Sequence, residues 1–257
     1  MASSELTFVS FGSDAFYRKL ARNTLKQLRE IYPGATYKTY GVSDLNCGKP
    51  NSECSPSTIK QYAALHPRGY GYWRWKPCVI ATALANQNDG GVVVYVDGRC
   101  SIPKEPVSWI SDFLTLKSSD LVAWQTNYLE RVWTTTDLLS KFGIGSESPE
   151  ALSGQFAATF FGIRNSRLTR SFVNNWETFL IENASLCRDD HPRLTNSHDF
   201  IENRYDQSSF SLLLKRREEL LSLMTLTDFD VMFSPSMRPH GKPHPLGSRV
   251  VRKLRLK

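Results

Sequence analysis

The chain has 257 residues, of which 40% are hydrophobic and 12% aromatic, so it can bury a substantial core and does not have the composition of a disordered protein. No apolar run approaches the roughly 20 residues that span a bilayer, and the first residues have neither the basic nor the apolar segment of a secretory signal. The formal net charge of +7 suits anionic partners such as nucleotides, nucleic acid or acidic lipid. We therefore expect a cytoplasmic protein, and the odd count of five cysteines without metal-ligand spacing predicts free thiols.

The first part of the chain predicts a strand, a helix and a second strand. Residues 6–13 have the pattern of a strand, and residues 15–32 repeat leucine at near-helical spacing until Pro33 and Gly34 end the helix. Residues 35–41 predict the second strand. A polar loop follows over residues 42–57, and a helix is expected near residues 57–64.

The centre of the chain predicts an aromatic turn, a helix and a buried strand. The turn lies at residues 69–75, and the helix begins with Pro77 at its first position. Four of the five residues from Val92 to Val96 are valine and the fifth is Tyr95, which indicates a strand buried on both faces. This strand ends at Asp97, Gly98 and Arg99.

The second half continues the alternation of helices and strands. Helices are predicted over residues 106–116, 134–144, 167–186 and 206–224, and strands over residues 121–126, 154–166 and 229–233. Such alternation favours an α/β sheet covered by helices on both faces. We expect one domain over residues 1–235, followed by a basic tail over residues 236–257 that is either solvated or in peripheral contact with a membrane.

The predicted strand ends place polar residues where ligands bind in α/β sheets, in the crevice beyond the carboxyl ends of the strands. Asp97 occupies one such end, and Ser10, Phe11 and Gly12 occupy another. Neither a G-x-G-x-x-G fingerprint nor a G-x-x-x-x-G-K-[ST] loop is present, which disfavours dinucleotide and P-loop functions. A lone carboxylate at a strand end binds a divalent cation or a sugar hydroxyl, or simply begins a turn with the glycine after it.

The neighbours of this carboxylate suggest contacts with phosphate. Gly98 would let a ligand approach the backbone, and Arg99 could face a phosphate with its planar donor fork. Lys76 precedes a proline, so we expect extended backbone there, at the positive end of a helix that attracts phosphate. The aromatic residues Tyr70, Tyr72, Trp73 and Trp75 either form a hydrophobic cap or stack on a base or sugar ring.

Three segments together resemble a known family: GYGYWRWKP at residues 69–77, VVVYVDGRC at residues 92–100 and YDQSSFSLLLKR at residues 205–216. They resemble GT-A-fold, nucleotide-sugar-dependent glycosyltransferases of the polysaccharide-biosynthesis type, over residues 6–214. The resemblance implies a GT-A-like (Rossmann-like) α/β fold, a mixed sheet flanked by helices. It also implies an Asp-x-Asp motif that holds Mn²⁺ or Mg²⁺ on the sugar-nucleotide diphosphate. Here Asp97 is the one acid of that motif and Arg99 stands in place of the second, so Arg99 could instead replace the charge of the metal.

The resemblance also implies roles for residues outside this motif. Asp206 would face the acceptor hydroxyl as general base, with Asp199 as a substitute, although Asp206 also suits a helix cap. The expected nucleotide-sugar site consists of Ser10, Phe11, Gly12, Lys76, Tyr95, Asp97, Gly98 and Arg99, with Asp97 also as metal ligand. The expected acceptor site consists of Trp124, Gln155 and Gln207, although core packing is the favoured interpretation of Trp124 and the polar Gln155 at the start of a strand needs no functional role.

The predicted function is transfer of a hexosyl or pentosyl group from a nucleotide sugar to a glycan or lipid-linked acceptor. A nucleotidyltransferase acting on sugar phosphates is one alternative, but residues 10–19 make a poor basic phosphate loop. A nucleic-acid-binding protein is another, but outside the tail the basic residues are scattered among acids. A catalytically silent relative is the third.

Overall fold

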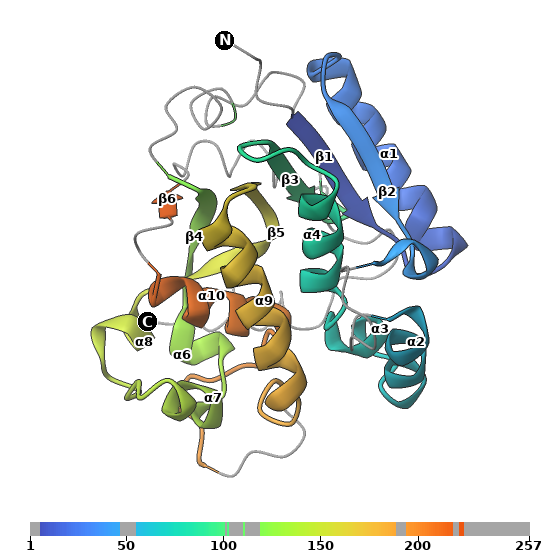
Figure 1. The fold of residues 1–257 in the computed structure, drawn as a ribbon. Coiled ribbons are helices and arrows are strands. Elements are labelled where there is room, and N and C mark those ends of the chain that lie inside the picture. Colours follow the sequence, from blue (N-terminus) through green and yellow to red (C-terminus); the bar gives the residue numbers. More distant parts are fainter. Residues whose placement is uncertain are drawn as a thin grey trace.

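The computed structural model describes residues 6–46, 55–100, 102, 110, 119–188, 194–217 and 221–223. In this part of the chain, six strands form one mixed sheet in the order β2-β1-β3-β5-β4-β6 (Figure 1). The strands are β1 (Leu6–Phe11), β2 (Thr36–Tyr40), β3 (Val92–Val96), β4 (Leu121–Leu129), β5 (Gly154–Arg164) and β6 (Leu221–Leu223). The α/β fold class with a mixed sheet flanked by helices is thus confirmed.

The directions of the strands bring the expected site residues to one edge. Strand β1 pairs in parallel with both β2 and β3, so the carboxyl ends of all three meet at the same edge. Strand β5 runs antiparallel to both β3 and β4, and β4 pairs in parallel with β6. The backbone of Asp97 continues the pairing with β5, because its N–H donates to the carbonyl of Thr159 at 2.8 Å.

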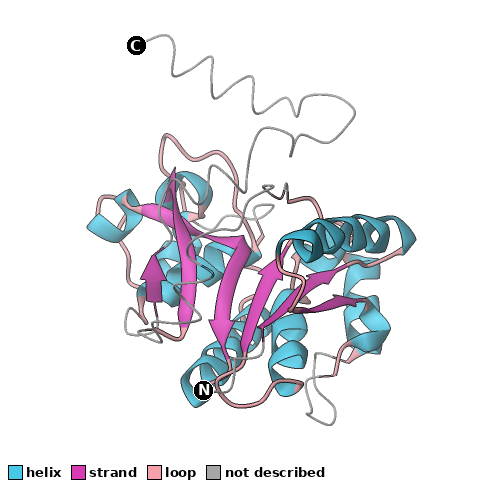
Figure 2. Ribbon diagram, turned by 90° about the horizontal axis from the view of Figure 1, so that it is seen from above, coloured by secondary structure: helices cyan, strands magenta, loops and turns pink. Residues whose placement is uncertain are grey.

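Helices cover both faces of the sheet (Figures 1 and 2). The helices are α1 (Ala15–Ile31), the 3-10 turn η1 (Val42–Asp44), α2 (Pro56–Leu65), α3 (Gly69–Tyr72), α4 (Lys76–Ala85), α6 (Glu130–Trp133), α7 (Thr136–Lys141), α8 (Pro149–Leu152), α9 (Arg167–Glu182) and α10 (Asp206–Lys215). None of the described helices is long and apolar enough to cross a membrane.

Strand β3 lies at the centre of the core, as its valine-rich sequence predicts. Val92, Val94 and Val96 pack into a cluster with the leucines of α1 on one face. Val93 and Tyr95 pack on the other face, in a cluster with α4, α9 and α10. All five residues of β3 are buried, because successive side chains of a strand point to opposite faces and both faces are covered here.

Two glycines let helix α1 approach the sheet edge closely. A Cβ on Gly12 would lie 2.3 Å from the backbone nitrogen of Arg18, and a Cβ on Gly98 would lie 2.8 Å from that of Ala21. The Thr24 hydroxyl also donates to the Gly98 carbonyl at 3.1 Å. Both glycines are therefore needed where β1 and β3 end against α1.

The structure corrects three expectations. Helix α10 ends at Lys215, and residues 221–223 form strand β6 because they pair in parallel with β4. Lys76 is helical, since α4 begins at this residue rather than after it. Cys78 is disulfide-bonded, so the prediction of free thiols is wrong there, although Cys100 and Cys187 are free.

Several predicted segments lie outside the described residues. They are most of the helix over residues 106–116, the strand over residues 229–233 and the tail over residues 236–257.

Candidate active site

A buried lysine joins two carboxylates at the carboxyl edge of the sheet. The Lys76 side chain comes from the first turn of α4 and is 2% exposed. Its Nζ lies 2.6 Å from Oδ2 of Asp206 and 3.6 Å from Oδ1 of Asp97, and it donates to the Ala158 carbonyl at 3.1 Å. Burial lowers the pKa of Lys76, but the charges of Asp206 and Asp97 outweigh burial and raise it, so the ammonium stays charged.

Asp206 is the first residue of α10 and is 5% exposed. Burial raises the pKa of its carboxyl from 3.8 to about 6, against the opposing effect of Lys76. A carboxyl that titrates near 6 can both accept and release a proton around neutral pH. The geometry therefore gives Asp206 the properties of a general base or acid.

Asp97 is held in place by the residue two positions before it in the chain. The Tyr95 hydroxyl donates to Oδ1 of Asp97 at 2.5 Å. Burial and the neighbouring Asp97 raise the pKa of Tyr95 well above 10, so its hydroxyl remains a donor. Tyr95 lines neither of the pockets described next, which makes it a residue that positions Asp97.

Two pockets meet at this cluster. The larger, about 430 Å³, is lined by Phe11, Ser13, Asp14, Tyr17, Pro67, Gly69, Tyr70, Trp73, Trp75, Asp97, Gly98 and Arg99. The smaller, about 210 Å³, is lined by Arg68, Trp73, Lys76, Asp97, Ala158, Thr159, Glu202, Asn203, Arg204, Tyr205, Asp206 and Gln207. They share Trp73 and Asp97, so the carboxylate of Asp97 lies at the junction between an aromatic pocket and a charged one.

The larger pocket has the aromatic walls and the exposed cation that the sequence suggested. The Trp75 ring stacks on Phe11 with centroids 3.9 Å apart. Arg99 is exposed, donates to the Tyr17 hydroxyl at 3.2 Å and lies over the Tyr17 ring. Aromatic rings and a guanidinium together suit a base or sugar ring beside a phosphate.

Backbone strain is concentrated around the pockets. In the described part of the chain, the non-glycine residues with positive φ are Tyr70, Tyr72, Trp73 and Tyr205. The Tyr205 ring contacts the rings of Tyr72 and Trp73 at centroid distances of 4.9 and 5.6 Å. Bulky residues with positive φ cost of order 1–3 kcal/mol each and cluster at functional sites, so the aromatic packing holds the loop before α10 in a strained form.

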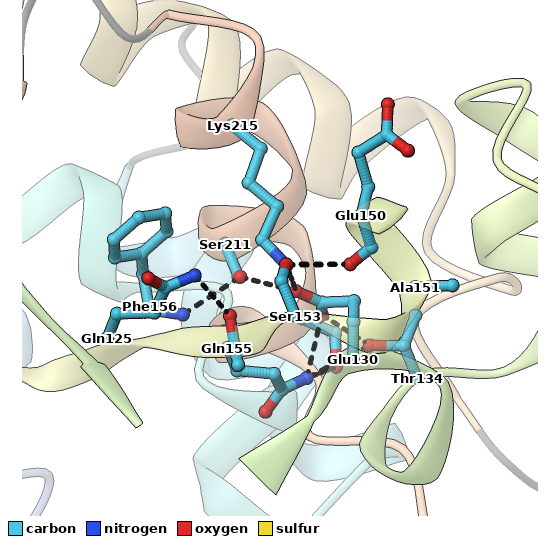
Figure 3. Close-up of polar contacts among 12 residues, drawn as sticks. Gln125, Glu130, Thr134, Glu150, Ala151, Ser153, Gln155, Phe156, Ser211 and Lys215 are labelled. Atoms are coloured by element: carbon cyan, nitrogen blue, oxygen red, sulfur yellow. Dashed lines mark hydrogen bonds and ion pairs between the residues drawn. The ribbon is translucent and has the colours of Figure 1, made fainter. Parts of the chain in front are cut away.

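A buried hydrogen-bond network connects β5 and Glu130 to α10, and Figure 3 shows the part of it around Glu130, Gln155, Ser211 and Lys215. Gln155 is 0% exposed, and its Nε2 donates to Glu130 Oε1 at 2.9 Å and to Ser208 Oγ at 3.2 Å. Its Oε1 accepts from Nε2 of Gln207 at 2.9 Å. Lys215 Nζ lies 2.7 Å from Oε2 of Glu130. Gln155 therefore connects β5 to the residues after Asp206, while Gln207 also lines the charged pocket.

The other expected site residues lie elsewhere. Ser10 is fully buried and lines neither pocket, and Gly12 faces α1 rather than a cavity. The Trp124 ring packs in the core cluster on the α1 face of the sheet, which corresponds to the core alternative for this residue. Asp199 pairs with Arg131 at 3.1 Å and lines neither pocket.

Sequence reasoning missed Arg68, Asn203 and Arg204, which all line the charged pocket. Asn203 and Arg204 directly precede the Tyr205-Asp206-Gln207 segment, and this proximity is the only signal that pointed to them.

The residues of the cluster fit a divalent metal ion poorly. The two carboxylates closest to the junction are already bridged by the Lys76 ammonium, which would repel a cation placed between them. Within the described residues, no group of three or more histidines, cysteines or acids could hold a metal ion.

No protein-family model matches the sequence, and no curated protein matches it. Among solved structures, the chain is similar to the galactosyltransferase LgtC in complex with donor and acceptor sugar analogues, with 14% identity, a TM-score of 0.45 and coverage of 92% of this chain and 84% of that one. It is also similar to the glycosyltransferase GlyE of Streptococcus pneumoniae TIGR4, with 13% identity, a TM-score of 0.40 and coverage of 88% and 46%. A third is a glycosyltransferase involved in glycosylation of the major capsid of PBCV-1, with 10% identity, a TM-score of 0.35 and coverage of 70% and 68%. With TM-scores below 0.5, these similarities assign neither the site nor its substrate.

Proposed function

We propose that this chain is a GT-A-type glycosyltransferase, which moves a sugar from a nucleotide-sugar donor to a hydroxyl of a glycan or lipid-linked acceptor. The observation that supports this most is the buried Lys76 ammonium between Asp97 and Asp206, at the junction of two pockets. One pocket would take the donor and the other the acceptor, so that the two substrates meet at Asp97.

The donor fits the larger, aromatic pocket. Its base and ribose would lie against Phe11, Tyr17 and Trp75, and Arg99 would contact the diphosphate. Charge develops on the diphosphate as the glycosidic bond breaks, and fixed cations in a water-poor site stabilise such charge strongly. Arg99 lines the donor pocket, and Lys76 lies beside Asp97 where the two pockets meet.

The acceptor fits the smaller pocket beside Asp206. In the transfer, the acceptor oxygen forms a bond to the anomeric carbon, and the bond from that carbon to the diphosphate breaks with its electron pair left on the diphosphate. The acceptor proton passes to the carboxylate of Asp206. A base that faces the acceptor suits a single displacement, so we propose inversion at the anomeric carbon.

We propose that Lys76 supplies the charge that the family resemblance assigns to Mn²⁺ or Mg²⁺. The side chain is fixed by two carboxylates and a carbonyl, so it needs little reorganisation during the reaction.

A thermal-shift panel of nucleotide sugars tests the proposal, because a ligand that binds only the folded state raises the melting temperature. At least one nucleotide sugar should raise it, and Asp97→Asn should reduce that shift. Asp89→Asn is the matched control, since Asp89 is 84% exposed at its side chain and pairs with Arg170 outside both pockets. The proposal fails if no nucleotide sugar shifts the transition, or if Asp97→Asn and Asp89→Asn behave alike.

A further inference from the structure

The charged pocket contains an arginine, Arg204, whose guanidinium pairs with no acid among the residues that the structure describes. Arg204 packs over the rings of Trp133 and Tyr128, with its Cζ 3.9 and 4.9 Å from their centroids. The guanidinium forms no hydrogen bond or ion pair with any described residue, although the charge of Glu202 is near enough to act on it. Burial lowers the pKa of Arg204, against the raising effects of Tyr128 and Glu202, but an arginine remains charged at any physiological pH.

A buried amide in the same pocket also lacks partners. Asn203 is 0% exposed, and neither Oδ1 nor Nδ2 of its side chain has a hydrogen-bond partner among the described residues. Leaving a buried polar group unpaired is costly, and most such groups in folded proteins are paired with protein, water or ligand. Two adjacent residues thus offer unused hydrogen-bonding groups at one pocket.

The remaining charges of the pocket are already matched. Arg68 pairs with Glu202 at 3.3 Å, and Lys76 pairs with Asp206 and Asp97. The lining therefore has no general excess of positive charge, and any preference for an anion must come from Arg204 itself.

From these contacts we propose that the pocket binds an acceptor with an oxyanion, a carboxylate or a phosphate, on Arg204 with help from the Asn203 amide. The inference rests on the proposed function, which places the acceptor in this pocket. Arg204 and Asp206 are two residues apart and both line it, so an anion on Arg204 would orient a neighbouring hydroxyl toward Asp206. The donor diphosphate does not explain Arg204, because Arg204 does not line the aromatic pocket.

Binding of simple sugars to the full chain tests this by ligand-observed NMR, with glucuronate, glucose 6-phosphate and neutral glucose as probes. At least one anionic sugar should bind about tenfold or more tightly than glucose, since hydrogen bonds to charged groups contribute more than neutral ones. The better of the two anionic probes identifies a carboxylate or a phosphate as the group recognised.

Arg204→Gln should abolish the preference, whereas Arg167→Gln, which removes the same charge from an exposed position at the start of α9, should retain it. Arg204→Lys keeps the charge without the planar fork and serves where the glutamine variant fails to fold. Equal binding of all three sugars to the wild-type chain overturns the inference, as does an anion preference that is undiminished in Arg204→Gln, or undiminished in Arg204→Lys where the glutamine variant does not fold.

The nucleotide-sugar panel separates the two proposals. If a nucleotide sugar binds but the sugars show no charge preference, the transferase proposal stands and the anion site falls. If an anionic sugar binds through Arg204 while no nucleotide sugar binds, the anion site stands and the transferase proposal falls.

Discussion

The pKa of about 6 at Asp206 makes the activity depend on pH in a defined direction. A general base must be ionised to accept the acceptor proton, so activity is full above this pKa and lost below it. We predict that kcat/KM falls about tenfold per pH unit below pH 6, because the pH dependence of kcat/KM reports the ionisation of groups in the free enzyme. Initial rates of nucleoside diphosphate release between pH 4.5 and 8 measure it.

Asp206→Asn should lower kcat by about 10²–10⁴, the usual contribution of a general base, and remove the acidic limb. Asp199→Asn is the matched control, because Asp199 pairs with Arg131 and lines neither pocket. Retention of the acidic limb by the Asp206 variant would show that another group titrates.

The Lys76 ammonium should also stabilise the fold. Removing one partner of a buried ion pair typically costs about 3–5 kcal/mol, because the other charge is left buried and unpaired. Lys76→Met should therefore lower the free energy of unfolding in urea by this amount, and Asp206→Asn added to it should restore part of the loss. The exposed Lys19→Met should change stability by no more than about 0.5 kcal/mol. Strictly additive effects of the two buried substitutions would argue against their coupling.

The same lysine leads to a prediction about metal ions. If the Lys76 ammonium supplies the positive charge in place of a metal ion, an excess of EDTA should leave the donor-induced rise in melting temperature unchanged. Added Mn²⁺ should not increase that rise. A shift that disappears with EDTA and returns with Mn²⁺ would show that a metal binds at Asp97 despite Lys76.

Single residues of the site were predictable by type but not by arrangement. Asp97 ends an unmistakable buried strand, and Lys76 and Asp206 lie in segments that resemble the family. Their contact was not predictable, because 130 residues separate Lys76 from Asp206 and no local pattern places one against the other. The sequence suggested a lysine that faces phosphate, whereas the fold buries Lys76 between two carboxylates.

At the scale of elements, the approach of α1 to the ends of β1 and β3 depends on two glycines. Gly98→Ala would place a Cβ 2.8 Å from the backbone of Ala21, and backbone cannot move aside as a flexible side chain can. We predict a loss of about 1–3 kcal/mol in the free energy of unfolding, as for other overpacked sites. Gly34→Ala is the control, since a Cβ there meets nothing within 4 Å and its φ is not positive. Equal stabilities of the two variants would contradict the packing role of Gly98.

The close approach of α1 to Gly98 gives the Asp97-Gly98 pair a different explanation from the one that the sequence suggested. Asp97 followed by Gly98 indicated a ligand that approaches the backbone, and Gly98 does line the aromatic pocket. The missing side chain, however, leaves room for a helix. Sequence alone cannot distinguish the two, because both require only the absence of a Cβ.

Elements with strong periodicity were predictable, and the end of α10 was not. Helix α1 and strand β3 each have one clear pattern, of period near 3.6 or of continuous apolar residues. The leucines after the charged run continue the spacing of α10, but the structure places residues 221–223 beside β4 as a strand. The pairing of these residues with β4 makes them a strand, and no short stretch of sequence around them contains β4.

For the whole molecule, alternation of helices and strands was enough to predict a helix-covered mixed sheet, while the two pockets follow from which strand ends become neighbours. Pairing of β3 with β5 brings Asp97 beside Ala158 and Thr159, and packing of α10 on β5 brings Asp206 to the same place. Strands β3 and β5 pair residues more than 60 positions apart, and Gln207 of α10 contacts Gln155 of β5 across 52 positions, so only the folded chain reveals the charged pocket.

The junction of the two pockets gives a prediction for both substrates at once. The Trp73 ring lines both pockets, whereas Tyr70 lines the aromatic one without the charged one, and both residues have positive φ. Asparagine tolerates this backbone conformation, so Trp73→Asn and Tyr70→Asn remove the rings with little added strain. Stacking of a base on an aromatic ring contributes about 1–3 kcal/mol, or roughly 5- to 150-fold in affinity. Steady-state kinetics should therefore show raised KM values for both donor and acceptor in Trp73→Asn. In Tyr70→Asn, the KM of the donor alone should rise. Identical effects of the two variants would mean that the pockets do not divide the substrates as proposed.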